Sequence, residues 1–117
     1  MKKTILVVED DDINKMLYID VLVASGYIVK SAANGEEALK ILESESVCLI
    51  ISDFQMPIMD GLTFFNNILN DENLRTIPLI GISGGGNKLE EFKRRSCIFL
   101  EKPINISFFL KTVKEAL

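Results

Sequence analysis

Polar residues with reactive or metal-binding side chains follow several short apolar runs of this sequence. If these runs are strands of one parallel sheet, their carboxyl ends meet at one edge, and the polar side chains meet there too. Acids from two strands, a hydroxyl group and an amine would then face one another. These residues are Glu9 and Asp10 at the end of the first run, Asp53 after the run 47–52, Ser83 after the run 77–82, and Lys102 after the run 98–100.

The residue types favour phosphoryl transfer beside a bound divalent cation. Neighbouring acids such as Glu9 and Asp10 repel each other, and oxygen ligands without histidine or cysteine suit a hard ion, Mg²⁺ before Zn²⁺. Asp53 would be the carboxylate nucleophile. Lys102 and the metal would neutralise the phosphoryl oxygens, and Ser83 would donate a hydrogen bond to one of them.

The apolar runs alternate with amphipathic segments. The runs 4–9 and 47–52 are uninterrupted, as expected for strands buried on both faces. A further strand is predicted at 77–82, and shorter strands are predicted at 27–30 and 98–100. Five strand–helix repeats predict an α/β fold with a parallel sheet, helices on both faces and right-handed crossovers. The predicted helices are 13–25, one opening at Asn34 with a capping-box acid at Glu37, one after Asp60, a short one opening at Asn87, and a terminal one containing Ile106 and Leu117.

The first predicted helix has Asp12 as its expected cap and ends at Gly26. Its expected apolar stripe includes Met16 and Leu17. A plainer interpretation of the acids before it is that they only cap this helix and favour its dipole. Asp11 and Asp12 suffice for capping, however, so this interpretation does not explain the acids that precede them.

Length and composition are those of one acidic, globular domain. For 117 residues, 48% of them hydrophobic and 26% charged, we expect a single domain over residues 1–117. The net charge of -4 argues against nucleic-acid binding, and no apolar run approaches the roughly 20 residues of a membrane span. The apolar start is too short for a signal peptide, so we expect a cytoplasmic protein. We interpret Cys48 and Cys97 as small core residues.

Histidine is absent from the sequence. A Ser-His-Asp triad and a Cys-His pair are therefore excluded, as are most zinc sites. Any phosphohistidine that takes part in phosphoryl transfer must come from a partner protein.

Four motifs in order resemble the receiver domain of bacterial two-component response regulators. They span nearly the whole chain, and each lies at the end of a predicted strand. The motifs are Ile5-Leu6-Val7-Val8-Glu9-Asp10-Asp11, Asp53-Phe54-Gln55-Met56-Pro57-Ile58-Met59-Asp60-Gly61, Ser83-Gly84 and Lys102-Pro103. The resemblance implies a flavodoxin-like (βα)5 three-layer sandwich with the parallel strand order 2-1-3-4-5.

The resemblance assigns roles to the residues that would bind phosphorus and metal. Asp53 matches the phosphoacceptor, Asp10 the main Mg²⁺ carboxylate, and Glu9 its neighbour, which acts directly or through water. The backbone carbonyl of Gln55 matches the third protein ligand of the ion. Glu9 stands where an aspartate is usual, so the metal is expected to lie slightly further out.

The remaining matches concern the phosphoryl group and the switch. Lys102 matches the phosphate-contacting lysine, and Pro103 a proline that a cis bond usually precedes. Ser83 matches the switch hydroxyl, and Phe99 occupies the switch position that tyrosine often holds. Lys102 follows Ser83 by 19 positions, about one helical turn fewer than the family usually has, so the fourth helix should be short.

The resemblance implies a stand-alone receiver that phosphorylation switches, with no enzyme activity beyond self-phosphorylation and autodephosphorylation. A histidine kinase or histidine phosphotransfer protein would donate the phosphoryl group to Asp53. Ser83 would then move toward the phosphoryl group, and Phe99 would turn inward. A downstream protein would bind the face formed by the fourth predicted helix, the strand at 98–100 and the terminal helix.

Three alternatives stay open. An aspartate-nucleophile phosphohydrolase uses similar chemistry, but its family places a second aspartate two positions after the nucleophile, where this chain has Gln55. A receiver-like scaffold that is never phosphorylated is disfavoured by the nearly complete set of acids, hydroxyl and lysine. A nucleotide-binding flavodoxin-like domain is the most distant alternative, since no phosphate-binding glycine motif follows the first strand.

Overall fold

A five-stranded parallel sheet lies at the centre of the protein. The computed structural model describes residues 2–53, 61–83 and 98–117. The strands are β1 (Thr4–Val8), β2 (Ile28–Ala32), β3 (Leu49–Asp53), β4 (Leu79–Ser83) and β5 (Ile98–Glu101), and the described helices are α1 (Asp12–Ala24), α2 (Gly35–Ser44), α3 (Gly61–Leu69) and α5 (Ile106–Ala116).

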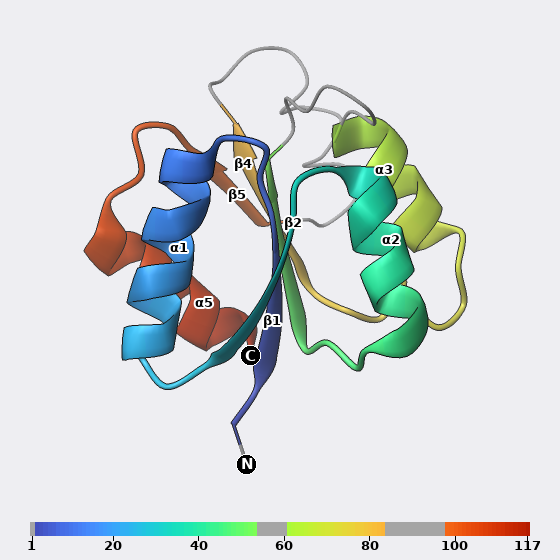
Figure 1. Ribbon diagram of the computed structural model, residues 1–117, viewed down its shortest axis with the longest axis horizontal. Helices are drawn as coiled ribbons and strands as arrows, with labels where there is room; N and C mark the ends of the chain where they lie inside the picture. Colours follow the sequence, from blue (N-terminus) through green and yellow to red (C-terminus); the bar gives the residue numbers. More distant parts are fainter. Residues whose placement is uncertain (1, 54–60, 84–97) are drawn as a thin grey trace.

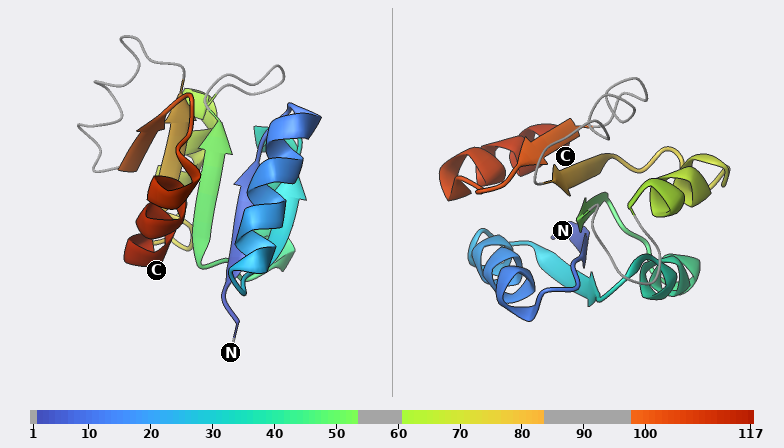
Figure 2. Two further views of the ribbon diagram at one scale, coloured as in Figure 1. Left: turned by 90° about the vertical axis from the view of Figure 1, so that its left-hand side faces the viewer. Right: turned by 90° about the horizontal axis from the view of Figure 1, so that it is seen from above.

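The strand order in the sheet is β2-β1-β3-β4-β5. Helices α1 and α5 cover one face of the sheet, and α2 and α3 cover the other (Figure 1), as the view from above in Figure 2 also shows. The predicted flavodoxin-like architecture and strand order are therefore confirmed. The predicted loop after Asp53 and the short helix predicted at Asn87 lie outside the described residues. No helix in the described part of the chain is long and apolar enough to cross a membrane.

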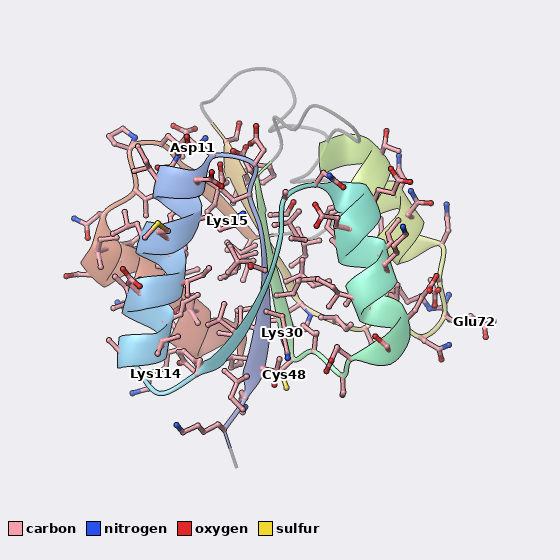
Figure 3. The ribbon with its side chains drawn as sticks, viewed as in Figure 1. Asp11, Lys15, Lys30, Cys48, Glu72 and Lys114 are labelled. Carbon is pink, nitrogen blue, oxygen red and sulfur yellow. The ribbon has the colours of Figure 1, made fainter. Side chains whose placement is uncertain are left out.

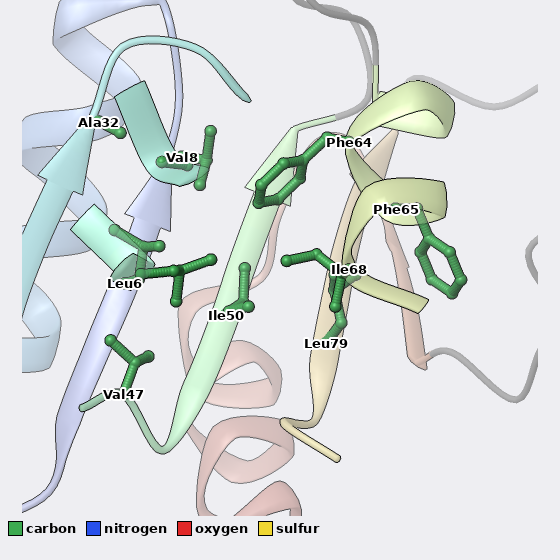
Figure 4. Close-up of a cluster of buried hydrophobic side chains, with 11 residues drawn as sticks. Leu6, Val8, Ala32, Val47, Ile50, Phe64, Phe65, Ile68 and Leu79 are labelled. Atoms are coloured by element: carbon green, nitrogen blue, oxygen red, sulfur yellow. The ribbon is translucent and has the colours of Figure 1, made fainter. Parts of the chain in front are cut away.

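Alternation along the central strands sends successive side chains into two separate cores. In β1, Ile5 packs with α1 and α5, whereas Leu6 packs with α2 and α3. Both side chains are fully buried, which explains why β1 is an uninterrupted apolar run and not an alternating one. Figure 4 shows the second core, where Phe64 of α3 lies over the sheet near Ile50 of β3.

Helix α1 buries a different face from the one predicted. Tyr18 and Leu22 are its buried residues, whereas Met16 and Leu17 are exposed, so the predicted apolar stripe was wrong. Apolar residues occur on both faces of this helix, and helical spacing alone therefore did not identify the face that meets the sheet. The helix ends before Gly26, as predicted, and the φ angle of Gly26 is 96°.

The N-cap of α1 is Asp11, one residue before the predicted Asp12. The Asp11 carboxylate accepts a hydrogen bond of 2.9 Å from the backbone N–H of Asn14. Asp12 already lies in the first helical turn, where its charge favours the helix dipole. In α2 the predicted cap Asn34 is confirmed, because it accepts a hydrogen bond of 2.9 Å from the backbone N–H of Glu37. The Glu37 carboxylate accepts a hydrogen bond of 3.3 Å from the backbone N–H of Ala33, one residue before the N–H that a capping box would use.

The interpretation of Cys48 as a core residue was wrong. Cys48 precedes β3 and is exposed at the edge of the sheet opposite to the one that Asp11 occupies (Figure 3). Its neighbour Val47 takes the buried position. Alternation of side chains near the start of a strand accounts for the difference, since adjacent residues point to opposite sides. Cys97 lies outside the described residues.

Candidate functional site

Acidic side chains from two neighbouring strands meet at the carboxyl edge of the sheet. β1 and β3 are hydrogen-bonded neighbours with Val8 opposite Ser52, so the next residue of each strand lies beside the other. One carboxylate oxygen from each of Glu9, Asp10 and Asp53 lies within 4.8 Å of the other two. We call these three residues the acidic cluster.

The members of the acidic cluster differ in their exposure to solvent. Glu9 and Asp53 are buried, with exposed fractions of 1% and 3%, whereas Asp10 is exposed. Asp53 is the last residue of β3 and pairs with Ile82 of β4, so the sheet fixes its backbone. The cluster therefore has a rigid, buried side and a side that faces water.

Lys102 reaches the acidic cluster from beyond β4. Its Nζ donates a hydrogen bond of 3.0 Å to Asp53 Oδ2, and the two groups form an ion pair. The backbone N–H of Lys102 donates a hydrogen bond of 2.8 Å to the carbonyl oxygen of Ser83, the buried last residue of β4. The peptide bond between Lys102 and Pro103 is cis, as the resemblance implied. The ends of β3, β4 and β5 are thus linked at the site.

Two side chains of the site, Glu9 and Lys102, have pKa values shifted from their ordinary values. Burial, and next the charge of Asp53, raise the pKa of Glu9 from 4.5 to about 8. Partial burial acts to lower the pKa of Lys102, but the hydrogen bond and the charge of Asp53 outweigh it, so that pKa is raised. The raised pKa of Glu9 means that the protein groups around it do not supply enough positive charge to keep every carboxyl group ionised at neutral pH.

A hard divalent cation fits the donor atoms of the acidic cluster. All three residues offer carboxylate oxygens, which are ligands that Mg²⁺ prefers. Glu9 Oε1 accepts a hydrogen bond of 3.2 Å from the N–H of Asp11, whereas Glu9 Oε2 is buried and has no hydrogen-bond partner among the residues that the structure describes. A buried acceptor without a partner is unfavourable, and a cation beside it would remove that cost.

Two predicted site residues remain, Gln55 and Phe99. Gln55, whose backbone carbonyl was predicted as a metal ligand, lies outside the described residues. Phe99 of β5 is partly buried and packs against the core that contains α2 and α3. Phe99 also lines a cavity of about 620 Å³ between β5 and α5, together with Ile104, Phe108 and Lys111.

The contacts of two residues near the acidic cluster were not predicted. The N–H of Asp11 holds Glu9 Oε1, and Figure 3 shows Asp11 at this edge of the sheet, at the start of α1. Tyr18 is buried, and its ring centroid lies 5.4 Å from that of Phe109. Burial, and next the charges of Glu9 and Asp53, raise the pKa of Tyr18 to about 12. Tyr18 and Leu22 are four positions apart and therefore lie on the same face of α1. The prediction instead placed the face with Met16 and Leu17 against the sheet.

Comparison with known sequences gives one family over almost the whole chain. The model of the response regulator receiver domain matches residues 5–114. The polar-differentiation response regulator DivK of Brucella anthropi is 34% identical over 120 residues, which cover 100% of this chain and 98% of that protein. The motifs recognised in the sequence and the match of the family model therefore agree.

Solved structures of response regulators share the fold along its full length. The chemotaxis response regulator CheY4 of Vibrio cholerae has a TM-score of 0.92 and 28% identity, with 100% of both chains covered. The response regulator TrrA of Thermotoga maritima, solved in complex with Mg(2+)-BeF, has a TM-score of 0.87 and 28% identity, with 98% of this chain and 99% of that chain covered. This chain belongs to the response regulator receiver domain family of two-component signalling.

Proposed function

We propose that Asp53 accepts a phosphoryl group from the phosphohistidine of a histidine kinase or a histidine phosphotransfer protein, and that the reaction requires Mg²⁺. The observation that carries the proposal is the surroundings of the buried Asp53 carboxylate. Its Oδ2 accepts a hydrogen bond of 3.0 Å from Lys102, and its carboxylate lies within 4.8 Å of Glu9 and Asp10. Receiver domains interact with histidine kinases and downstream targets, and this chain has no histidine of its own.

In the proposed step, one carboxylate oxygen of Asp53 attacks phosphorus and forms an O–P bond. The P–N bond to the donor imidazole breaks, its electron pair stays on that nitrogen, and the nitrogen takes up a proton from solvent. The ammonium group of Lys102 offsets the added negative charge. Ser83, at the end of β4, donates its hydroxyl hydrogen to a phosphoryl oxygen.

The acidic cluster would hold the ion, together with the backbone carbonyl of Gln55 that the resemblance implies. When bound, Mg²⁺ supplies positive charge that stabilises the transferring phosphoryl group. The same side chains support self-phosphorylation by a small phosphodonor and hydrolysis of the acyl phosphate by water. Receiver domains are signalling domains and not classical enzymes, so we expect no turnover of external phosphate esters.

The proposed output surface lies over β5 and α5. The cavity of about 620 Å³ is lined by the apolar side chains of Phe99, Ile104 and Phe108 and also by Lys111. Phe108 is 57% exposed, so it is available to a partner protein. Movement of Ser83 toward the phosphoryl group would let Phe99 change its rotamer and thereby reshape the cavity. The helix predicted at residue 87, the third part of this surface, lies outside the described residues.

Incubation with acetyl phosphate tests the proposed function. Intact-protein mass spectrometry should show one added phosphoryl group in the presence of Mg²⁺, and none in EDTA or in Asp53→Asn. Asp12→Asn is a matched control, because Asp12 is an exposed acid outside the acidic cluster, and it should react like the wild type. Phosphorylation of Asp53→Asn would reject the nucleophile, and full reaction in EDTA would reject the Mg²⁺ requirement. Turnover of p-nitrophenyl phosphate would favour the phosphohydrolase alternative.

A further inference from the structure

We infer that a cavity between the C-terminal ends of α2 and α3 binds an organic cation, namely a guanidinium or ammonium group carried on a short apolar chain. The cavity has a volume of about 400 Å³ and is lined by residues of α2, of α3 and of the segment after α3. We call it the α2–α3 cavity. The two helices lie side by side on one face of the sheet (Figure 1). The inference does not depend on the proposed function.

The α2–α3 cavity lies away from the acidic cluster. Helix α2 ends at Ser44, shortly before β3 begins at Leu49, and the segment after α3 leads to the start of β4 at Leu79. Both strands begin at the amino edge of the sheet, whereas Asp53 lies at the carboxyl edge. A ligand in this cavity would therefore bind at a second site and would not contact the proposed phosphoacceptor.

The walls of the α2–α3 cavity carry negative charge without a positive partner. Glu43, in the last turn of α2, and Asp71, two positions after the end of α3, both line it. Neither carboxylate forms an ion pair with another residue in the described part of the chain. Lys30 of β2 pairs with Glu45, which does not line the cavity. A cation that enters the cavity therefore meets two carboxylates that no described side chain neutralises.

The ends of the two helices add to this negative potential. The C-terminal end of a helix carries roughly half a negative elementary charge, because its last carbonyl groups have no partner within the helix. Both α2 and α3 reach the cavity with their last turns, through Glu43 and Asn67, and neither has a basic residue in its last turn. A cation in the cavity is thus stabilised by two helix ends as well as by two side chains.

The apolar part of the wall favours an organic cation over a metal ion. Leu39, Leu42 and Leu74 line the cavity, and they would remove the methylene groups of an alkyl chain from water. A hydrated metal ion would gain nothing from these side chains. Glu43 and Asp71 also belong to no group of three potential metal ligands among the residues that the structure describes.

The polar groups of the cavity suit a group with several N–H donors. Asp71 is held in place, because its Oδ1 accepts a hydrogen bond of 2.8 Å from the backbone N–H of Asn73. The side-chain amides of Asn67 and Asn73 also line the cavity, and their oxygens are hydrogen-bond acceptors. Ligand sites range over roughly 300–1,000 Å³, so this cavity is the size for a small ligand or for one long side chain of a larger one.

Titration of ¹⁵N-labelled protein with n-butylguanidinium chloride tests the inference by NMR. The amide signals of Leu42, Glu43 and Leu74 should shift and reach saturation. The dissociation constant should be on the order of 1 mM, because exposed ion pairs contribute little. The neutral analogue n-butylurea has nearly the same shape and should bind about tenfold more weakly. Sodium chloride at matched concentration controls for ionic strength.

Isosteric variants assign the binding to the two carboxylates. Glu43→Gln and Asp71→Asn should each weaken the binding of n-butylguanidinium by about two- to fivefold. Asp71→Asn keeps an oxygen that can accept the N–H of Asn73, so the shape of the segment should persist. Glu72→Gln is the matched control, since Glu72 is an exposed acid next to Asp71 that does not line the cavity (Figure 3). This variant should bind as the wild type does.

Two peptides distinguish a free small cation from an arginine side chain of a partner protein. One is a glycine pentapeptide with a central arginine, and the other carries the neutral citrulline in its place. Binding of the arginine peptide at least as tight as that of n-butylguanidinium would assign the cavity to a partner's arginine, and weaker binding would assign it to a free cation. Equal binding of n-butylurea and n-butylguanidinium, or unchanged affinity in both Glu43→Gln and Asp71→Asn, would overturn the inference. So would the absence of any saturable shift at concentrations well above the expected constant.

Discussion

The ammonium group of Lys102 donates a hydrogen bond of 3.0 Å to Oδ2 of Asp53. This contact joins the ends of β3 and β5, which are not neighbours in the sheet because β4 lies between them. A change in the charge on Asp53 therefore acts directly on the segment that follows β5. Phe99 lies on that strand, three positions before Lys102, and lines the cavity beside α5.

Replacing Lys102 with methionine should destabilise the metal-free protein by about 1–3 kcal/mol at pH 7, because Asp53 would stay buried without its charged hydrogen-bond donor. Urea unfolding in the presence of EDTA measures the free energy of unfolding of both proteins. Lys40→Met, at an exposed position of α2, is the control and should change stability by less than about 0.5 kcal/mol. Equal stability of Lys102→Met and the wild type would show that the contact with Asp53 does not stabilise the fold.

The pH dependence of stability should reveal the buried carboxyl group of Glu9. Its pKa is about 8 in the folded protein against an ordinary value of 4.5, so the folded state holds this proton more tightly than the unfolded chain. The resulting stabilisation is fully present below about pH 4.5 and disappears as the pH rises to about 8. Relative to Glu9→Gln, the unfolding free energy of the metal-free wild type should therefore fall by at least about 1 kcal/mol as the pH rises across this range. Urea unfolding at both pH values measures this, and a constant difference between the two proteins would be the contrary result.

Two adjacent phenylalanines of α5 should differ sharply in their effect on stability. Phe109 is fully buried against Tyr18, with ring centroids 5.4 Å apart, and Phe109→Ala should cost about 3–5 kcal/mol. Phe108 is 57% exposed, and Phe108→Ala should cost less than about 1 kcal/mol. Thermal or urea unfolding of the two variants checks this, and similar losses in both would mean that the register of α5 is different.

The position of the α1 cap can be tested in the same way. Asp11 accepts the N–H of Asn14, so Asp11→Ala should destabilise the protein by about 1 kcal/mol. Asp12→Ala removes an exposed acid of the first turn and its ion pair with Lys15, 3.5 Å from Oδ1 to Nζ, and should cost about 0.5 kcal/mol or less. A larger loss of stability in Asp12→Ala than in Asp11→Ala would show that Asp12 is the N-cap, as the sequence predicted.

Most of the fold could be predicted because the central strands are buried on both faces. Residues such as Ile5 and Leu6 enter different cores, so the strand must be apolar throughout, and the sequence shows this directly. The buried face of α1 could not be predicted, since Met16 and Tyr18 are both suitable core residues. Tyr18 packs in the core that contains Ile5 and Phe109, and spacing within the helix does not encode these tertiary contacts.

The convergence of the site residues could be predicted from the strand order, whereas the burial and hydrogen bonds of each residue could not. Glu9 and Asp53 end adjacent parallel strands, so any sheet with this order brings them together. The difference in burial between Glu9 and Asp10 depends on how the chain turns into α1 and on the N–H of Asp11. Both depend on the folded structure, and the residue types alone do not show which of the two acids is buried.

Reduction of the phosphorylated protein with borohydride tests most directly whether Asp53 is the phosphoacceptor. Borohydride converts an aspartyl phosphate to homoserine, and tandem mass spectrometry then locates the altered residue. After treatment with acetyl phosphate and Mg²⁺, we predict homoserine at position 53 and at no other position. Reduction at Asp10 or Glu9, or phosphorylated protein that yields no reduced residue, would contradict the assignment.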